Sequence, residues 1–114
     1  MTFDEYQKQA ITTDTFGGKP QPITSMAFIS KLLGLVGEAG EVADKFKKVY
    51  RDDESELTPE KLELMKKELG DVLWYISVMG SYLGLSLEDI AQLNLDKLSD
   101  RKARGVLKGS GDNR

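Results

Sequence analysis

The 114-residue sequence contains no cysteine and no histidine. Without cysteine the chain has no disulfide, no thiolate metal ligand and no cysteine nucleophile, a composition that fits a reducing cytoplasm. Without histidine it lacks the usual general base, the usual zinc ligand and the Glu-x-x-His pairs of di-iron helical bundles. Any hydrolytic chemistry must therefore rest on carboxylates, lysine, tyrosine or water activated by a metal.

Long apolar runs and an excess of positive charge are also missing. The most apolar stretch, residues 72–85, is interrupted by Ser and Gly and is shorter than the roughly 20 residues of a membrane span. The N-terminus has no basic region followed by an apolar run, so we read no signal peptide and expect a cytoplasmic protein. The formal net charge is −3. We therefore expect binding neither to membranes nor to nucleic acids.

Apolar residues recur along the chain at the spacing of α-helices, and only three prolines interrupt it. A short helix is predicted over residues 3–12, followed by an irregular loop that contains Gly17, Gly18 and two of the prolines. A long second helix is predicted to begin at a cap, Thr24 or Ser25, and to run to about residue 50.

The second half of the chain repeats this pattern. An acidic turn at residues 51–54 is predicted to break the second helix, and Thr58 then caps a third helix that ends near residue 83. A fourth helix is predicted over residues 86–104. The sequence thus predicts one all-α domain, residues 1–105, built as a small bundle of four main helices, with a Gly-rich tail at 106–114.

The third predicted helix is apolar nearly all round between Leu69 and Leu83. A helix that is apolar on every side must be buried on every side. Three other helices of one small subunit do not supply that cover. We therefore expect the bundle to be completed by dimerisation, as a homodimer, with a tetramer as the alternative assembly.

Two pairs of carboxylates share one spacing and lie midway along the second and third predicted helices. Glu38 and Glu41 form one pair, and Glu68 and Asp71 form the other. Residues three apart on a helix project from the same face, and two antiparallel helices can turn such faces toward each other. Four crowded carboxylates at the border of an apolar face are unfavourable unless they bind a hard cation such as Mg²⁺ or Mn²⁺. The spacing therefore marks all four as candidate metal ligands.

The same residues also allow a purely structural interpretation. Glu41 and Lys45 are four apart, an ordinary salt-bridge spacing on a solvated helix, in a sequence with 31% charged residues. Against this, Gly37, Gly40 and Gly70 adjoin the acids and weaken their helices, which is easier to explain if close backbone approach or room for a ligand is needed. The pattern alone leaves a metal site and surface salt bridges as equal alternatives.

Glu38-x-x-Glu41, then 26 residues, then Glu68-x-x-Asp71 resembles the signature of the MazG-like, all-α nucleoside triphosphate pyrophosphohydrolases. The similarity extends to residues 35–42 and 67–75, to Tyr6-Gln7, and to the Gly-Ser-Gly-Asp ending. It implies that the four acids bind Mg²⁺, with Mn²⁺ as an alternative, in a helical bundle that forms dimers or tetramers. It also implies hydrolysis of a (d)NTP to the nucleoside monophosphate and pyrophosphate, with a role in house-cleaning of the nucleotide pool.

A triphosphate requires positive charge beyond the metal, and the fourth predicted helix supplies it. Asn94, Lys97 and Arg101 share one helix face, and Asn94 is in line with apolar residues and so expected to be partly buried. The plain alternative is a core Asn beside a solvated basic helix end that complements the helix dipole. Because the family resemblance places an Asn and basic residues here, we predict that these three side chains bind the substrate. The Gly-rich tail is expected to help close the site.

The predicted reaction is metal-assisted hydrolysis without a covalent nucleophile. A carboxylate that is not fully used as a ligand, Glu38 or Glu41, accepts the proton of the attacking water, which makes these two the predicted catalytic residues. Two other functions remain open. One is a non-enzymatic helical dimerisation or adaptor module, and the other is a hydrolase of another pyrophosphate such as phosphoribosyl-ATP.

Overall fold

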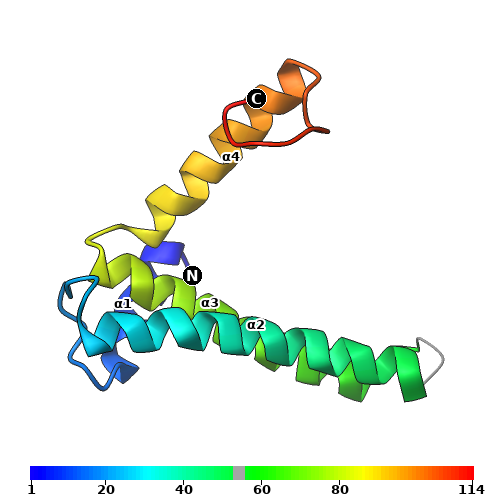
Figure 1. Cartoon of the computed structure of the whole chain (residues 1–114), viewed down its shortest axis with the longest axis horizontal. Coiled ribbons are helices and arrows are strands. Elements are labelled where there is room, and N and C mark those ends of the chain that lie inside the picture. Colours follow the sequence, from blue (N-terminus) through cyan, green and yellow to red (C-terminus); the bar gives the residue numbers. More distant parts are fainter. Residues whose placement is uncertain (53–55) are drawn as a thin grey trace.

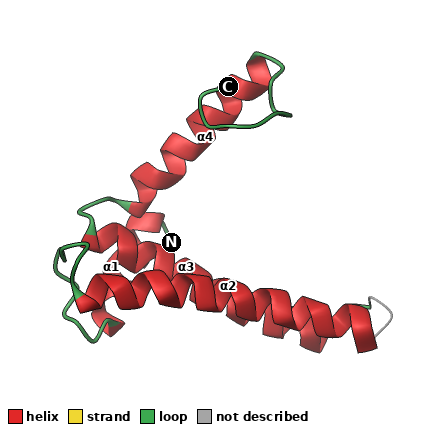
Figure 2. Cartoon of the chain, viewed as in Figure 1, coloured by secondary structure: helices red, strands yellow, loops and turns green. Residues whose placement is uncertain are grey.

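The computed structural model describes residues 1–52 and 56–114 of the chain. Within these ranges every regular element is helical and there is no strand, which confirms the predicted all-α class (Figure 2). The elements are α1 (Phe3–Ala10), the 3₁₀ turn η1 (Ile11–Thr13), α2 (Met26–Asp52), α3 (Pro59–Tyr82) and α4 (Leu87–Ala103). None of the helices in these ranges is long and apolar enough to cross a bilayer.

The helix ends follow local side-chain chemistry. Ser25, rather than Thr24, caps α2, because its Oγ accepts a hydrogen bond from the Phe28 N–H at 3.1 Å. Thr58 caps α3 in the same way, with Pro59 in the first turn. α3 and α4 are each followed by a glycine with positive φ, +71° at Gly84 and +69° at Gly105, a conformation that stops a helix at little steric cost.

Two predicted boundaries differ from the structure. The first helix ends at residue 10 instead of 12, because the chain tightens into η1 before it turns into the loop. The first half of the acidic turn predicted at 51–54 is wrong, because Arg51 and Asp52 belong to the last turn of α2 and form a two-bond ion pair at 2.6 Å. The other two residues of that predicted turn lie outside the described residues.

α2 and α3 run antiparallel along most of their length, and α1 packs at the end where α2 begins and α3 ends (Figure 1). The core lies at this end. Phe28 of α2 packs against Tyr82 of α3, with ring centroids 6.5 Å apart, and Ala27 and Val78 complete the buried cluster. This packing fixes the register in which the middle of α2 meets the middle of α3.

A buried ion pair ties the loop after η1 to the same core. The Asp14 carboxylate lies 3.0 Å from the Lys31 ammonium, and the two side chains are 0% and 8% exposed. The Tyr82 hydroxyl donates a hydrogen bond to Asp14 at 2.5 Å, and the Gly18 N–H donates another at 3.2 Å. Three chain segments therefore meet at one carboxylate, which holds the N-terminal part of α2 against the C-terminal part of α3.

α4 does not pack alongside the other helices. It meets α1 and α3 at its beginning, where the Gln7 side chain accepts a hydrogen bond from the Leu87 N–H at 2.8 Å, and then points away from α2 (Figure 1). Among the described residues α4 makes no contact with α2. The four helices are those predicted, but one chain does not close them into a bundle.

The open arrangement leaves apolar side chains of α3 in solvent. Leu69 is 55% exposed, and it belongs to a row of exposed residues at intervals of seven, which are Leu62, Leu69, Ile76 and Leu83. Residues seven apart lie on one helix face, so this row is a continuous apolar stripe. The stripe is the uncovered side of the helix that the sequence shows to be apolar nearly all round, and completion by dimerisation stays a prediction.

Candidate metal centre

The antiparallel pairing of α2 and α3 brings three carboxylates together. Glu38 projects from the middle of α2, and Glu68 and Asp71 project from one face of α3. One carboxylate oxygen of each residue lies within 4.8 Å of the other two. Glu38 and Glu68 are half-buried and Asp71 is exposed, so the cluster opens to solvent on the Asp71 side.

The crowding of charge acts most strongly on Glu38. Burial raises the pKa of its carboxyl group, and the negative charges of Asp71, Glu68 and Glu41 raise it further. The Lys45 ammonium opposes this shift without cancelling it. A carboxylate whose ionised form is disfavoured in this way is stabilised by any cation that joins the cluster.

Glu41 lies outside the group of three. Its side chain is 55% exposed and its carboxylate is 3.7 Å from the Lys45 ammonium, which also lies 3.1 Å from Glu68. Both carboxylates raise the pKa of Lys45, and the hydrogen bond that Lys45 donates to Glu68 is the largest cause. Lys45 therefore supplies the positive charge at this edge of the cluster and links the two halves of the motif.

The donor set fits a hard divalent cation. All three clustered ligands are carboxylate oxygens, and neither thiolate nor imidazole is present anywhere in the sequence. Oxygen-only sites suit Mg²⁺ and Mn²⁺. The raised pKa of Glu38 agrees with this fit, because burial and the neighbouring carboxylates disfavour its ionised form more than Lys45 favours it.

Sequence reasoning missed two neighbours of the cluster. Lys45, which the sequence offered only as a salt-bridge partner of Glu41 on a solvated helix, is half-buried and bridges to Glu68 of α3. Tyr6 of α1 has its pKa raised by burial and by the charge of Asp71, so the phenol belongs to the surroundings of the cluster. The Glu41–Lys45 spacing was visible in the sequence, but no local pattern links Tyr6 or Lys45 to the third helix.

Two explanations were offered for the glycines beside the acids, and the first of them, close backbone approach, is wrong. A Cβ atom added at Gly37, Gly40 or Gly70 would meet no atom within 4 Å in the described part of the chain. The close approach occurs instead at Gly34, where an added Cβ would overlap the ring of Tyr75. Gly34 thus lets α3 pack tightly on α2, whereas the other three leave open space next to the carboxylates.

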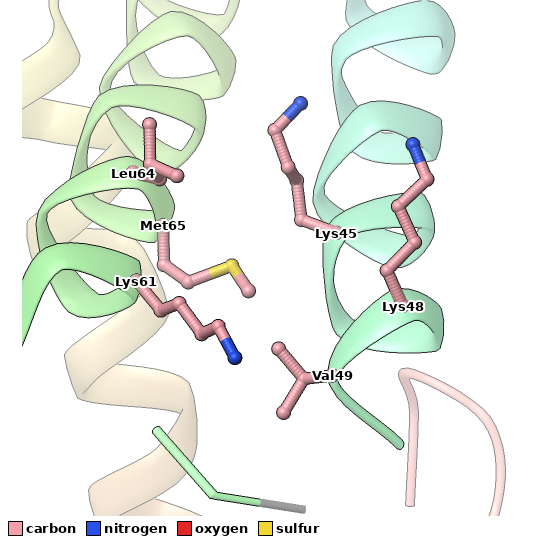
Figure 3. A pocket seen from close by; sticks show the side chains of 6 residues that line it. All are labelled: Lys45, Lys48, Val49, Lys61, Leu64 and Met65. Atoms are coloured by element: carbon pink, nitrogen blue, oxygen red, sulfur yellow. The ribbon is translucent and has the colours of Figure 1, made fainter. Parts of the chain in front are cut away.

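A cavity of about 160 Å³ adjoins the cluster on the side where α2 ends and α3 begins (Figure 3). Lysines of both helices line it together with the buried side chains of Val49 and Met65. Leu64, which also lines it, precedes Glu68 by one helical turn. The surroundings of the carboxylates therefore combine positively charged and apolar side chains.

The predicted substrate-binding residues lie on α4, away from the carboxylates. Asn94, expected to be partly buried, is exposed because α4 stands apart from α2. Lys97 and Arg101 both contact Asp112 of the C-terminal tail, at 3.1 and 3.3 Å. One chain does not bring these three side chains together with Glu38, Glu68 and Asp71.

Comparison with known proteins identifies the family of the chain. The family model of the MazG nucleotide pyrophosphohydrolase domain matches residues 27–106. The "Gene 37 protein" of Mycobacterium phage L5 is 42% identical over 116 aligned positions that cover all of both chains. No solved structure matches the chain. The match covers most of the sequence, including all four acids of the motif, and the chain belongs to the MazG nucleotide pyrophosphohydrolase family.

Proposed function

We propose that this protein is a Mg²⁺-dependent pyrophosphohydrolase that converts a (d)NTP into the nucleoside monophosphate and pyrophosphate. The observation that carries the proposal is the cluster of Glu38, Glu68 and Asp71, in a chain of the MazG family. We expect the enzyme to act in the cytoplasm on the nucleotide pool. An adaptor role is less well supported, because it leaves three adjacent carboxylates without a stabilising cation.

Each acid of the motif has a proposed role. Glu38, Glu68 and Asp71 would hold Mg²⁺, or Mn²⁺ in its place, with Glu41 as the fourth carboxylate of the motif. When bound, the metal supplies positive charge to the triphosphate and lowers the pKa of water. The Lys45 ammonium contacts one carboxylate oxygen of Glu68, so a cation bound in the cluster would repel it.

Glu38 is the preferred proton acceptor of the attacking water, with Glu41 as the alternative. A general base must lie within hydrogen-bond reach of the proton that it accepts, and Glu38 belongs to the carboxylate cluster whereas Glu41 does not. The half-buried position of Glu38 on α2, opposite the two acids of α3, also restricts its rotamers. Glu41 is more exposed and engaged with Lys45.

Asn94, Lys97 and Arg101 are proposed to bind the substrate across a subunit boundary. α4 points away from its own α2, and the exposed stripe of α3 offers an apolar surface to a second copy. A homodimer in which α4 of one subunit covers the α2–α3 pair of the other would bury this surface. It would also bring the basic face of α4 toward a triphosphate held at the carboxylates.

The test is turnover by the purified chain with a panel of NTPs and dNTPs, including damaged bases, in Mg²⁺ or Mn²⁺. Pyrophosphate and the monophosphate are measured by ³¹P NMR, which also separates this reaction from hydrolysis of phosphoribosyl-ATP. Glu38→Ala and Asp71→Ala should each lower kcat by more than about 100-fold. Glu63→Ala is the matched control, because Glu63 is an exposed acid of α3 that pairs with Lys66. Absence of turnover with every nucleotide, or normal rates in both variants, would refute the proposal.

A further inference from the structure

The C-terminal tail, residues 105–114, folds back onto the end of α4 and is fastened there by hydrogen bonds. The Arg114 guanidinium donates to the carbonyls of Val106, Leu107 and Gly111 at 3.2, 3.1 and 2.6 Å. Arg104 of α4 donates to the Arg114 carbonyl at 2.7 Å. The tail is thus a closed loop at the tip of the helix.

This loop places the Asp112 carboxylate between the two basic residues of α4. One carboxylate oxygen lies 3.1 Å from the Lys97 ammonium and 3.3 Å from the Arg101 guanidinium. Both contacts lower the pKa of Asp112, with the Lys97 hydrogen bond as the first cause. The two cations that are proposed to bind a triphosphate therefore converge on an anion of their own chain.

Arg101 is buried but incompletely satisfied. Its side chain is 6% exposed, and its Nη2 donates to the Gly111 and Asp112 carbonyls as well as to the Asp112 carboxylate. Its Nε has no hydrogen-bond partner within the described residues. A guanidinium binds phosphate best as a fork, through two parallel N–H bonds. The tail engages Nη2 and leaves Nε buried without a partner among the residues that the structure describes, so the hydrogen-bonding capacity of the guanidinium is only partly used.

Asp112 itself is weakly held, because its side chain is 81% exposed. Exposed ion pairs contribute little to stability, and a polyphosphate carries more negative charge than one carboxylate. Gly109 and Gly111, with φ of +147° and +85°, form the turn that presents Asp112 to the two cations. Lys97 and Arg101 thus have the geometry of an anion site, and the Asp112 carboxylate in this site is held weakly enough to be displaced.

We propose that Lys97 and Arg101 form a preassembled polyphosphate site that Asp112 occupies until a nucleotide displaces it. Asp112 is a competitor of the substrate within the chain, and its displacement by a polyphosphate loosens the tail from α4. The identity of the natural ligand rests on the proposed function, whereas the displacement itself does not. If the tail merely caps α4, loss of the Asp112 charge would leave the affinity of Lys97 and Arg101 for an anion unchanged.

The test measures binding of inorganic tripolyphosphate to the full-length protein by calorimetry, in buffer with EDTA so that no metal contributes. Asp112→Asn should bind tripolyphosphate about threefold to fivefold more tightly than wild type, since it loses the competing charge but keeps the shape. Asp100→Asn is the matched control, because Asp100 pairs with Arg104 at the same end of α4 and should change the affinity less than about twofold.

A second measurement follows the tail directly. Tripolyphosphate should increase hydrogen exchange at the backbone amides of residues 106–114 in wild type. Unchanged or weaker binding by Asp112→Asn, or slower exchange of the tail amides when tripolyphosphate is added, would overturn the proposal. Neither measurement requires turnover, so a protein without hydrolytic activity can still confirm the displacement, and an active enzyme can still contradict it.

Discussion

Replacing Asp14 by alanine removes the carboxylate on which the loop after η1, α2 and α3 converge. The variant leaves the Lys31 ammonium buried without its counter-ion and the Tyr82 hydroxyl without its acceptor. Burial by itself raises the pKa of Asp14, but the hydrogen bond from Tyr82 and the contact with Lys31 outweigh it and hold the pKa below its usual range. The folded state therefore favours the ionised carboxylate.

The expected loss of stability is about 3 kcal/mol. Removing one partner of a buried ion pair costs roughly 3–5 kcal/mol. The lower end applies here, because the Lys31 ammonium also lies over the rings of Phe16, Trp74 and Tyr82, at 4.7, 5.6 and 5.8 Å from their centroids. For a chain of this size that loss corresponds to a Tm lower by about 12 °C.

Thermal unfolding followed by circular dichroism, at one fixed protein concentration, measures the effect. Asp14→Ala, Lys31→Met and the double variant together give the coupling between the two side chains. Because the folded-state pKa of Asp14 is lowered, its contribution is present above about pH 4 and is lost as pH falls through the folded-state pKa. Lys66→Ala, in an exposed pair with Glu63, should change stability by less than about 0.5 kcal/mol. A loss below about 1 kcal/mol for Asp14→Ala, or the same loss at pH 7 and pH 2, would refute the reasoning.

Two further predictions concern the carboxylate cluster and the helix pair. Glu38→Gln should raise the Tm of the metal-free protein and abolish the further rise in Tm on adding Mg²⁺. Because the pKa of Glu38 is raised in the folded state, the gain in stability should be present at pH 8 and absent below about pH 4. Thermal unfolding at both pH values checks this prediction. Gly34→Ala should cost about 1–3 kcal/mol, because the new methyl group meets the Tyr75 ring, whereas Gly37→Ala, with open space around it, should stabilise the helix by up to about 1 kcal/mol. Urea unfolding measures both effects, and equal effects of the two substitutions would contradict the close packing of Gly34 on the Tyr75 ring.

Much of the local structure follows from the sequence, because it depends on residues three or four apart. Helical periodicity and the capping residues located all four helices, with boundary errors of a few residues. The same periodicity predicted that Glu68 and Asp71 share a face and that the acids of α2 face them, and the structure brings Glu38 to both. Sequence resemblance supplied the expected reaction class. The family model confirms that the chain belongs to the predicted family.

Contacts between distant segments were decided by the tertiary structure alone. The rotation of α2 against α3 selects Glu38 for the cluster and leaves Glu41 outside it, and the Asp14–Lys31 pair joins residues with no shared periodicity. The direction of α4 leaves Lys97 and Arg101 with the tail instead of the carboxylates. Hydrogen-bond geometry within a helix fixes neighbours three and four residues apart, whereas helix rotation, register and direction emerge only from the sum of many weak packing contacts.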